Sequence, residues 1–168
     1  NALLSAGCIL FLFWSITRLV RYLLKEEKGE LSITDVIIIL GSGLVGALAY
    51  TFSDTFWFSA VEGEVYAFSS FLTALVFWMI LRWQDESDSV CGDRWIILIA
   101  YIIGLSIGVH LLNLLCIPAI VLVFYYQKYQ TISLKGVIGA ITLSGLLIVL
   151  ILFVYIPGVA GMGGWFEL

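Results

Sequence analysis

The stretch Leu134–Ile156, LKGVIGAITLSGLLIVLILFVYI, is the clearest guide to the fold of this chain. Its one charged residue is Lys135, near the start, and the rest is mostly apolar or small. A helix needs roughly 20 predominantly apolar residues to cross the hydrocarbon core of a bilayer. Leu134–Ile156 meets that length, so it predicts a membrane-spanning helix.

The composition of the whole chain agrees with this stretch. Hydrophobic residues make up 62% of the 168 positions and charged residues 12%, and the mean hydropathy is +1.10. Soluble domains are closer to half apolar and a quarter charged. The formal charge of −4 and the absence of a basic cluster argue against nucleic acid as a partner. The expected partner is the lipid bilayer.

The runs that resemble Leu134–Ile156 predict an all-α, polytopic bundle of transmembrane helices. A mixed acidic and aromatic segment, 55–64, is expected at the membrane interface. The long apolar run 95–126 is interrupted by His110 and Asn113, so it is divided into two short crossings. The predicted crossings are 2–24, 33–52, 65–83, 95–109, 112–126 and 134–156. Residues 1–168 are expected to form a single transmembrane module, a fragment of a longer chain.

The eight lysines and arginines test this topology. With six alternating crossings, all eight lie in or beside the connections around 18–35, 82–94 and 127–135. The positive-inside rule makes that face cytoplasmic and both ends of the chain extracytoplasmic. The opposite face has no lysine or arginine and carries Asp54, Glu62, Glu64, Glu167 and the single histidine, His110.

Two glycine motifs lie inside predicted crossings. Gly41–Gly46, GSGLVG, matches the G-x-G-x-x-G pattern of dinucleotide-binding folds, which requires a preceding strand. Within a membrane helix, small residues instead let neighbouring helices approach closely. We expect packing roles for this motif and for the Gly104 and Gly108 pair.

The segment 53–66 places carboxylates beside aromatic rings at the predicted membrane surface. A solvated interfacial loop would explain Asp54, Trp57, Glu62, Glu64 and Tyr66 without any function. Alternatively they line a pocket, because aromatic faces suit sugar rings and carboxylates accept hydrogen bonds or act as bases. Ionisable groups at membrane depth are often functional, but on these residues alone both interpretations stay open.

His110 and Asn113 lie between the two short crossings. They are either polar residues that tie two helices together or groups that face the extracytoplasmic site. His110 is the one side chain on that face able to carry positive charge, so it is a candidate for binding a phosphate.

Three stretches carry a resemblance to a known family: Asn1–Ala6 (NALLSA), Ser53–Tyr66 (SDTFWFSAVEGEVY) and Gly104–Pro118 (GLSIGVHLLNLLCIP). They resemble a family of multi-pass bacterial membrane proteins that is similar to the protein O-mannosyltransferases and belongs with the GT-C glycosyltransferases. The resemblance covers essentially the whole chain. It implies a partial GT-C membrane module in a bacterial inner membrane.

The resemblance also implies an activity. Such enzymes transfer a sugar, here mannose-like, from a polyprenyl-phosphate carrier to a protein or glycan acceptor on the extracytoplasmic side. Their main acidic motif is expected before Asn1, so the fragment alone is expected to be inactive. The substrate-binding residues that carry over are Asp54, Trp57, Glu62, Glu64, Tyr66, His110 and Asn113.

Two other functions remain open on the sequence alone. Polar groups within broken membrane helices are also typical of transporters and flippases, although the halves of this chain show no repeat. A structural subunit without a site would tolerate substitution in segment 53–66. A divalent metal is possible, but the carboxylates of this sequence lack the spacing of a metal site, so no cofactor is assigned.

Overall fold

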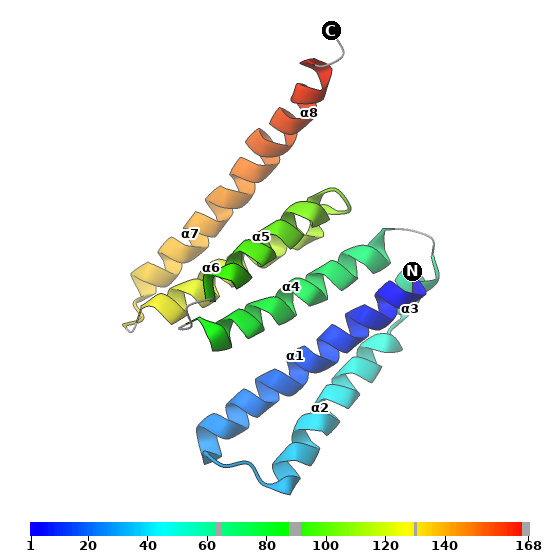
Figure 1. The fold of residues 1–168 in the computed structure, drawn as a ribbon, viewed down its shortest axis with the longest axis vertical. Coiled ribbons are helices and arrows are strands. Elements are labelled where there is room, and N and C mark those ends of the chain that lie inside the picture. Colours follow the sequence, from blue (N-terminus) through cyan, green and yellow to red (C-terminus); the bar gives the residue numbers. More distant parts are fainter. Residues whose placement is uncertain (63–64, 88–91, 130, 166–168) are drawn as a thin grey trace. The chain divides into compact units, whose positions relative to one another are not determined.

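The computed structural model describes residues 1–62, 65–87, 92–129 and 131–165, and every regular element in these ranges is helical (Figure 1). The predicted all-α class is confirmed. The elements are α1 (Ala2–Lys28), α2 (Ile33–Thr51), α3 (Asp54–Val61), α4 (Tyr66–Glu86), α5 (Gly92–Ile107), the 3₁₀ helix η1 (Leu111–Leu115), α6 (Cys116–Lys128), α7 (Leu134–Leu150), the π-helix η2 (Ile151–Tyr155) and α8 (Ile156–Trp165).

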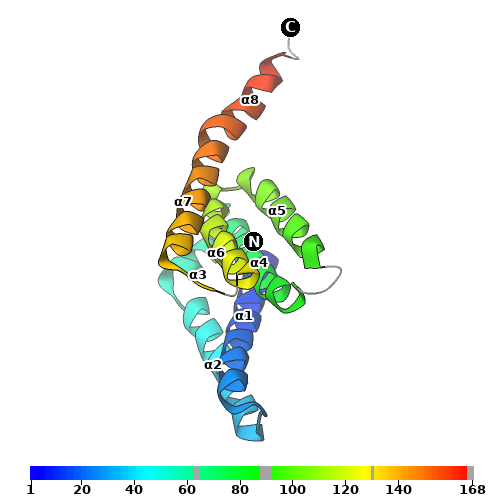
Figure 2. The same ribbon diagram turned by 90° about the vertical axis from the view of Figure 1, so that its left-hand side faces the viewer.

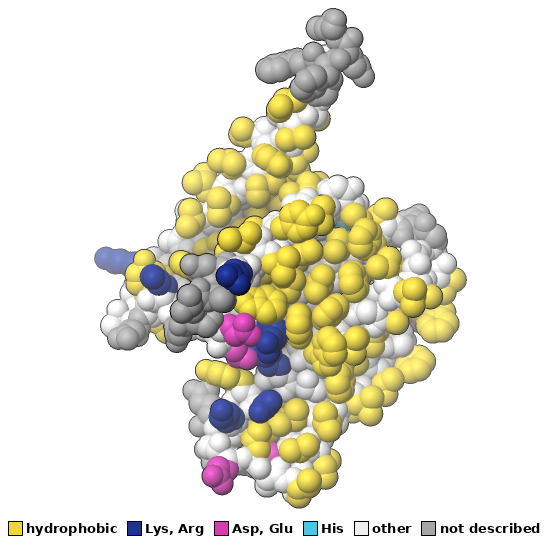
Figure 3. Space-filling model, viewed as in Figure 1, with side chains coloured by type: hydrophobic (Ala, Val, Ile, Leu, Met, Phe, Trp, Pro, Cys, Tyr) yellow, Lys and Arg dark blue, Asp and Glu magenta, His cyan; other side chains and the backbone are white. Residues whose placement is uncertain are grey.

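Four described helical spans are long and apolar enough to cross a membrane: Ala2–Lys25, Ile33–Thr51, Tyr66–Glu86 and Leu134–Met162. Much of their apolar surface faces outward, as with Ile37 and Val45 of α2, which are 66% and 68% exposed. Figure 3 shows hydrophobic side chains over most of the visible surface. The helices Arg94–Ile107 and Asn113–Lys128 are shorter, so the count of six crossings stays a prediction.

The contacts divide the chain into two compact units, residues 1–113 and residues 114–168. In the first unit α1 packs against both α2 and α4, and α5 packs against α4 (Figure 1, Figure 2). The division falls in the predicted break of the run 95–126, because α5 ends at Ile107 and a short turn precedes η1.

Glycines of the G-x-G-x-x-G motif account for the close packing of α1 and α2. A Cβ at Gly43 would lie 3.0 Å from two ring carbons of Phe13 and closer still to Thr17 Cγ2. A Cβ at Gly46 would lie 2.5 Å from Ile16 Cδ1, whereas Gly41 has nothing within 4 Å. The packing role is therefore confirmed for Gly43 and Gly46. The same expectation is wrong for Gly41 and Gly104, whose Cβ positions are open.

Aromatic rings fill the interface between α1 and α4. Phe11 lies 5.8 Å from Phe71 and 5.3 Å from Trp78, centroid to centroid, and Trp14 lies 5.8 Å from Trp78. Such pairs contribute about 0.5–1.5 kcal/mol each beyond their buried area. These contacts fix α4 against α1, and with it the residues at the N-terminal end of α4.

A capping box begins α2. The buried Asp35 carboxylate accepts hydrogen bonds from the backbone N–H of Ser32 (2.9 Å) and from its hydroxyl (2.7 Å), and Ser32 Oγ accepts from the Asp35 N–H. These bonds satisfy backbone donors that a helix N-terminus otherwise leaves unpaired.

We expect Asp35→Ala to destabilise the fold by about 1 kcal/mol, because the substitution removes the carboxylate half of the capping box and leaves the Ser32 N–H and hydroxyl without this acceptor. Unfolding in mixed detergent micelles would measure the change. Thr34→Ala, at an exposed neighbour in the same turn, is the matched control and should cost less than about 0.5 kcal/mol. Equal effects from the two substitutions would contradict a specific capping role.

In the second unit, the helix that begins at Leu134 continues past the predicted end of the crossing at Ile156. Pro157 has no N–H to donate, and in an α-helix its ring clashes with the carbonyl group four residues earlier. The π-helix η2, which comes just before Pro157, accommodates the ring because its hydrogen bonds are shifted by one residue. The N–H of Ile156 bonds to the carbonyl of Ile151. The helix then runs on as α8 to Trp165, so the helix is longer than the predicted crossing 134–156, whose end stays a prediction.

Candidate functional site

One end of the first unit gathers the start of α1, the short helix α3 and the start of α4. The Asn1 side chain donates a hydrogen bond to the backbone carbonyl of Glu62, which fixes the end of α3 beside the first turn of α1. Phe56 packs α3 against α2, since Phe56 is buried and its ring centroid lies 4.7 Å from that of Tyr50 in α2. We call this region, with Tyr66 and His110, the Asn1 end.

The helix α3 presents an acidic and aromatic face outward. Asp54 and Trp57 are three residues apart on this helix, so they share a face, and both are exposed. Glu62 is exposed at the helix C-cap. Glu64, which was predicted with them, lies outside the described residues. This exposed face could accept hydrogen bonds from a polar ligand at the membrane surface.

The structure brings together Tyr66 and His110, which are far apart in sequence. Their ring centroids lie 5.6 Å apart, with the planes tilted by 55°. Tyr66 is the first residue of α4, and His110 ends the turn after α5, where its N–H bonds to the carbonyl of Ser106 at 2.8 Å. The contact orients the imidazole without enclosing it, because Tyr66 is exposed and His110 is half-buried.

A row of polar groups leads from Tyr66 and His110 into the bundle. Ser69 and Thr73 follow Tyr66 on the same face of α4, and Asn113 follows His110 by three residues. Asn113 is fully buried, and its amide oxygen lies within hydrogen-bonding distance of the Thr73 hydroxyl. That hydroxyl also lies 2.9 Å from the Ser69 carbonyl oxygen. Its single hydrogen serves one of these acceptors at a time.

Two buried polar atoms in this row have no hydrogen-bond partner among the described residues, Ser69 Oγ and Asn113 Nδ2. A buried donor without a partner costs about 1–3 kcal/mol. Ser69 and Asn113 therefore retain hydrogen-bonding capacity, which is typical of a place where a water molecule or polar ligand is accommodated.

Six of the seven predicted site residues are described, and they fall into two groups. Tyr66 with His110 forms one contact, and Asn113, three residues after His110, forms a second with Thr73, which also contacts the Ser69 carbonyl. For the side chains of Asp54, Trp57 and Glu62, no hydrogen bond or ring contact to these residues is present among the described residues. Ser69 and Thr73 carry a sequence signal that was not used, namely polar residues three and seven positions after Tyr66 within an apolar helix.

Within the described part of the chain, no group of three His, Cys, Asp or Glu side chains is placed to hold a metal ion. The chemistry available at the Asn1 end is hydrogen bonding by imidazole, phenol and amide groups, with exposed carboxylates on α3.

Apolar helices of spanning length, with a polar site at one end of them, define a multi-pass α-helical membrane protein. Residues 1–133 match the family described as the protein O-mannosyl-transferase TMEM260 N-terminal domain. The chain belongs to this family, so it is an O-mannosyltransferase-like membrane protein. No curated protein and no solved structure matches the chain.

Proposed function

We propose that this chain is part of a GT-C-type glycosyltransferase of a bacterial inner membrane. It would transfer a mannose-like sugar from a polyprenyl-phosphate carrier to a protein or glycan acceptor. The family supports the reaction class, since its description names a protein O-mannosyl-transferase. The observation that carries the site assignment is the Tyr66–His110 contact above the buried Asn113.

In this proposal His110 binds the phosphate of the carrier. No lysine or arginine occurs in segments 53–66 and 109–113, so His110 is the one side chain there able to carry positive charge. Tyr66 holds the ring in place, and Asn113 positions the turn through its contact with Thr73. The exposed face of Asp54 and Trp57, with Glu62 and Glu64 following, would contact sugar or acceptor hydroxyl groups.

The proposed orientation places the Asn1 end outside the cytoplasm. All eight lysines and arginines lie in or beside the opposite connections, and the positive-inside rule favours a cytoplasmic location for those segments. By the family resemblance, the acceptor hydroxyl is deprotonated by a carboxylate that precedes Asn1.

A transfer assay tests this function. Full-length protein in proteoliposomes would be given radiolabelled polyprenyl-phosphate mannose and a folded acceptor protein. We expect label to become covalently attached to serine or threonine hydroxyls of the acceptor. Absence of transfer with every polyprenyl-phosphate sugar supplied, from protein that is folded and correctly oriented, would overturn the proposal.

The second candidate is a transporter or flippase. The observation that favours it is the interruption of the apolar run 95–126 between α5 and α6, where η1 contains the buried Asn113, as in the interrupted helices of transport sites. The same proteoliposomes separate the two functions. Movement of labelled carrier between leaflets without sugar transfer would support transport.

A further inference from the structure

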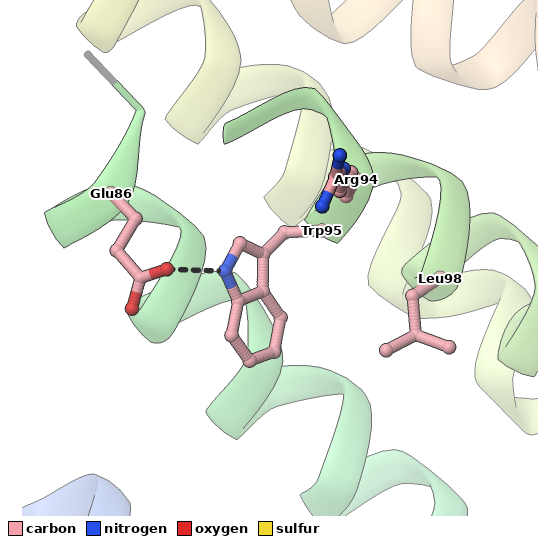
Figure 4. A pocket seen from close by; sticks show the side chains of 4 residues that line it. All are labelled: Glu86, Arg94, Trp95 and Leu98. Atoms are coloured by element: carbon pink, nitrogen blue, oxygen red, sulfur yellow. Dashed lines mark hydrogen bonds between the residues drawn. The ribbon is translucent and has the colours of Figure 1, made fainter. Parts of the chain in front are cut away.

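The opposite end of the first unit carries a network of charges that joins three helices. Arg18 of α1 pairs with Asp85 of α4. One turn away, Arg82 Nη2 lies 2.6 Å from Glu86 Oε1, and the indole nitrogen of Trp95 on α5 donates to Glu86 Oε2 at 2.8 Å (Figure 4). We call this region the arginine end.

This network leaves Glu86 with little unbalanced charge. One carboxylate oxygen accepts from a guanidinium and the other from an indole N–H. The Arg82 guanidinium also lies 5.9 Å from the centre of the Trp95 ring, within the range of a cation–π interaction. Arg82 and Glu86 therefore cancel as a local pair, and Trp95 is fixed in orientation between them.

A hollow of about 180 Å³ lies beside this pair, lined by Glu86, Arg94, Trp95 and Leu98. Figure 4 shows the Trp95 indole directed toward Glu86, with Arg94 beside it on the same helix. Arg94 is exposed, and no ion pair to it occurs among the side chains that the structure describes. Glu86 is already bonded to Arg82 and Trp95, so Arg94 is the lining side chain that offers its charge to an anion.

An apolar track runs from the hollow along α5. Leu98, Tyr101 and Leu105 follow Arg94 at four, seven and eleven residues, which places all four on one stripe of the helix. Leu98, Tyr101 and Leu105 are 44%, 61% and 52% exposed. At 1.5 Å per residue the stripe is about 16 Å long, close to the hydrocarbon thickness of one leaflet, roughly 15 Å.

We propose that the arginine end binds an anionic phospholipid. Its phosphate lies in the hollow against Arg94, and one acyl chain follows Leu98, Tyr101 and Leu105. A phospholipid has a charged group joined to an apolar chain. This site likewise has a cation at the start of α5 followed by an apolar stripe. This site is separate from the Asn1 end, and it does not depend on the proposed transferase activity.

Lipid titration of the full-length protein tests this proposal. Delipidated protein in detergent would be titrated with dioleoyl phosphatidylglycerol, and bound lipid would be counted by native mass spectrometry. We expect Arg94→Gln to weaken binding about fivefold to tenfold, through loss of one charge-assisted contact. Lys25→Gln removes a cation from another connection of the same face, so it serves as the matched control and should change affinity less than about twofold.

Glu86→Gln should act in the opposite direction. Glutamine keeps one of the two acceptor oxygens, so it retains the bond from Arg82 or the bond from Trp95 but not both. It also removes the negative charge beside Arg94, so affinity for phosphatidylglycerol should rise severalfold. Three results would overturn the proposal: equal losses from Arg94→Gln and Lys25→Gln, equal affinity for phosphatidylcholine and phosphatidylglycerol, or displacement of the lipid by equimolar glycerol phosphate. The last would assign the hollow to a soluble phosphate.

Discussion

Sugar transfer by the full-length protein should fall about 10- to 100-fold when His110 is replaced by alanine. The substitution removes the proposed phosphate ligand at the Asn1 end, and a hydrogen bond to a charged group contributes about 1.5–3 kcal/mol. If the imidazole holds the phosphate equally in the bound donor and in the transition state, the loss appears mainly in KM for the carrier. Initial rates over a range of carrier concentrations would separate KM from kcat.

Two further variants distinguish a phosphate ligand from a structural residue. His110→Gln retains a hydrogen-bond donor near the same position and should recover part of the loss, whereas a packing defect would not be relieved in this way. Tyr66→Phe keeps the ring that lies 5.6 Å from the imidazole and should leave KM nearly unchanged. Full transfer activity in the double variant Glu64→Gln with His110→Ala would remove both residues from the site.

The sequence was a good guide to the helices because the signal for a membrane helix is local. The predicted crossings 2–24, 33–52 and 65–83 correspond to α1, α2 and α4 to within a few residues. The last helix differs because Pro157 normally ends an α-helix, and the preceding π-turn that accommodates it has no simple sequence signature. The assignment of all eight lysines and arginines to one face depends on the number of crossings. The orientation in the membrane therefore stays a prediction.

The candidate site was harder to predict because it depends on contacts between distant segments. Nothing local indicates that Tyr66 meets His110, or that Thr73 meets Asn113, forty residues further along the chain. The clustering of carboxylates with aromatics in 53–66 suggested one pocket, but α3 directs Asp54 and Trp57 outward while Phe56 is buried. The helical period of a segment only eight residues long decides which side chains point inward.

The largest effect on stability is expected at Gly43. Gly43→Leu should destabilise the protein by about 2–3 kcal/mol, because added side-chain atoms cannot be accommodated without moving α1 away from α2. A Cβ there already meets the Phe13 ring and Thr17 Cγ2. The Thr17 hydroxyl donates to the Trp14 carbonyl at 3.0 Å, so rotation of this side chain away from the clash would break a hydrogen bond.

Gly41→Leu is the matched control, since it adds the same atoms to the same helix at a position with nothing within 4 Å. It should be neutral within about 0.5 kcal/mol or slightly stabilising, because leucine favours helix more than glycine does. Unfolding in mixed detergent micelles gives both values. Phe13→Ala makes space at the contact, so it should recover about 1 kcal/mol when combined with Gly43→Leu but not with Gly41→Leu. Equal destabilisation by the two leucines would show instead that helix flexibility, rather than the α1–α2 contact, explains the glycines of this motif.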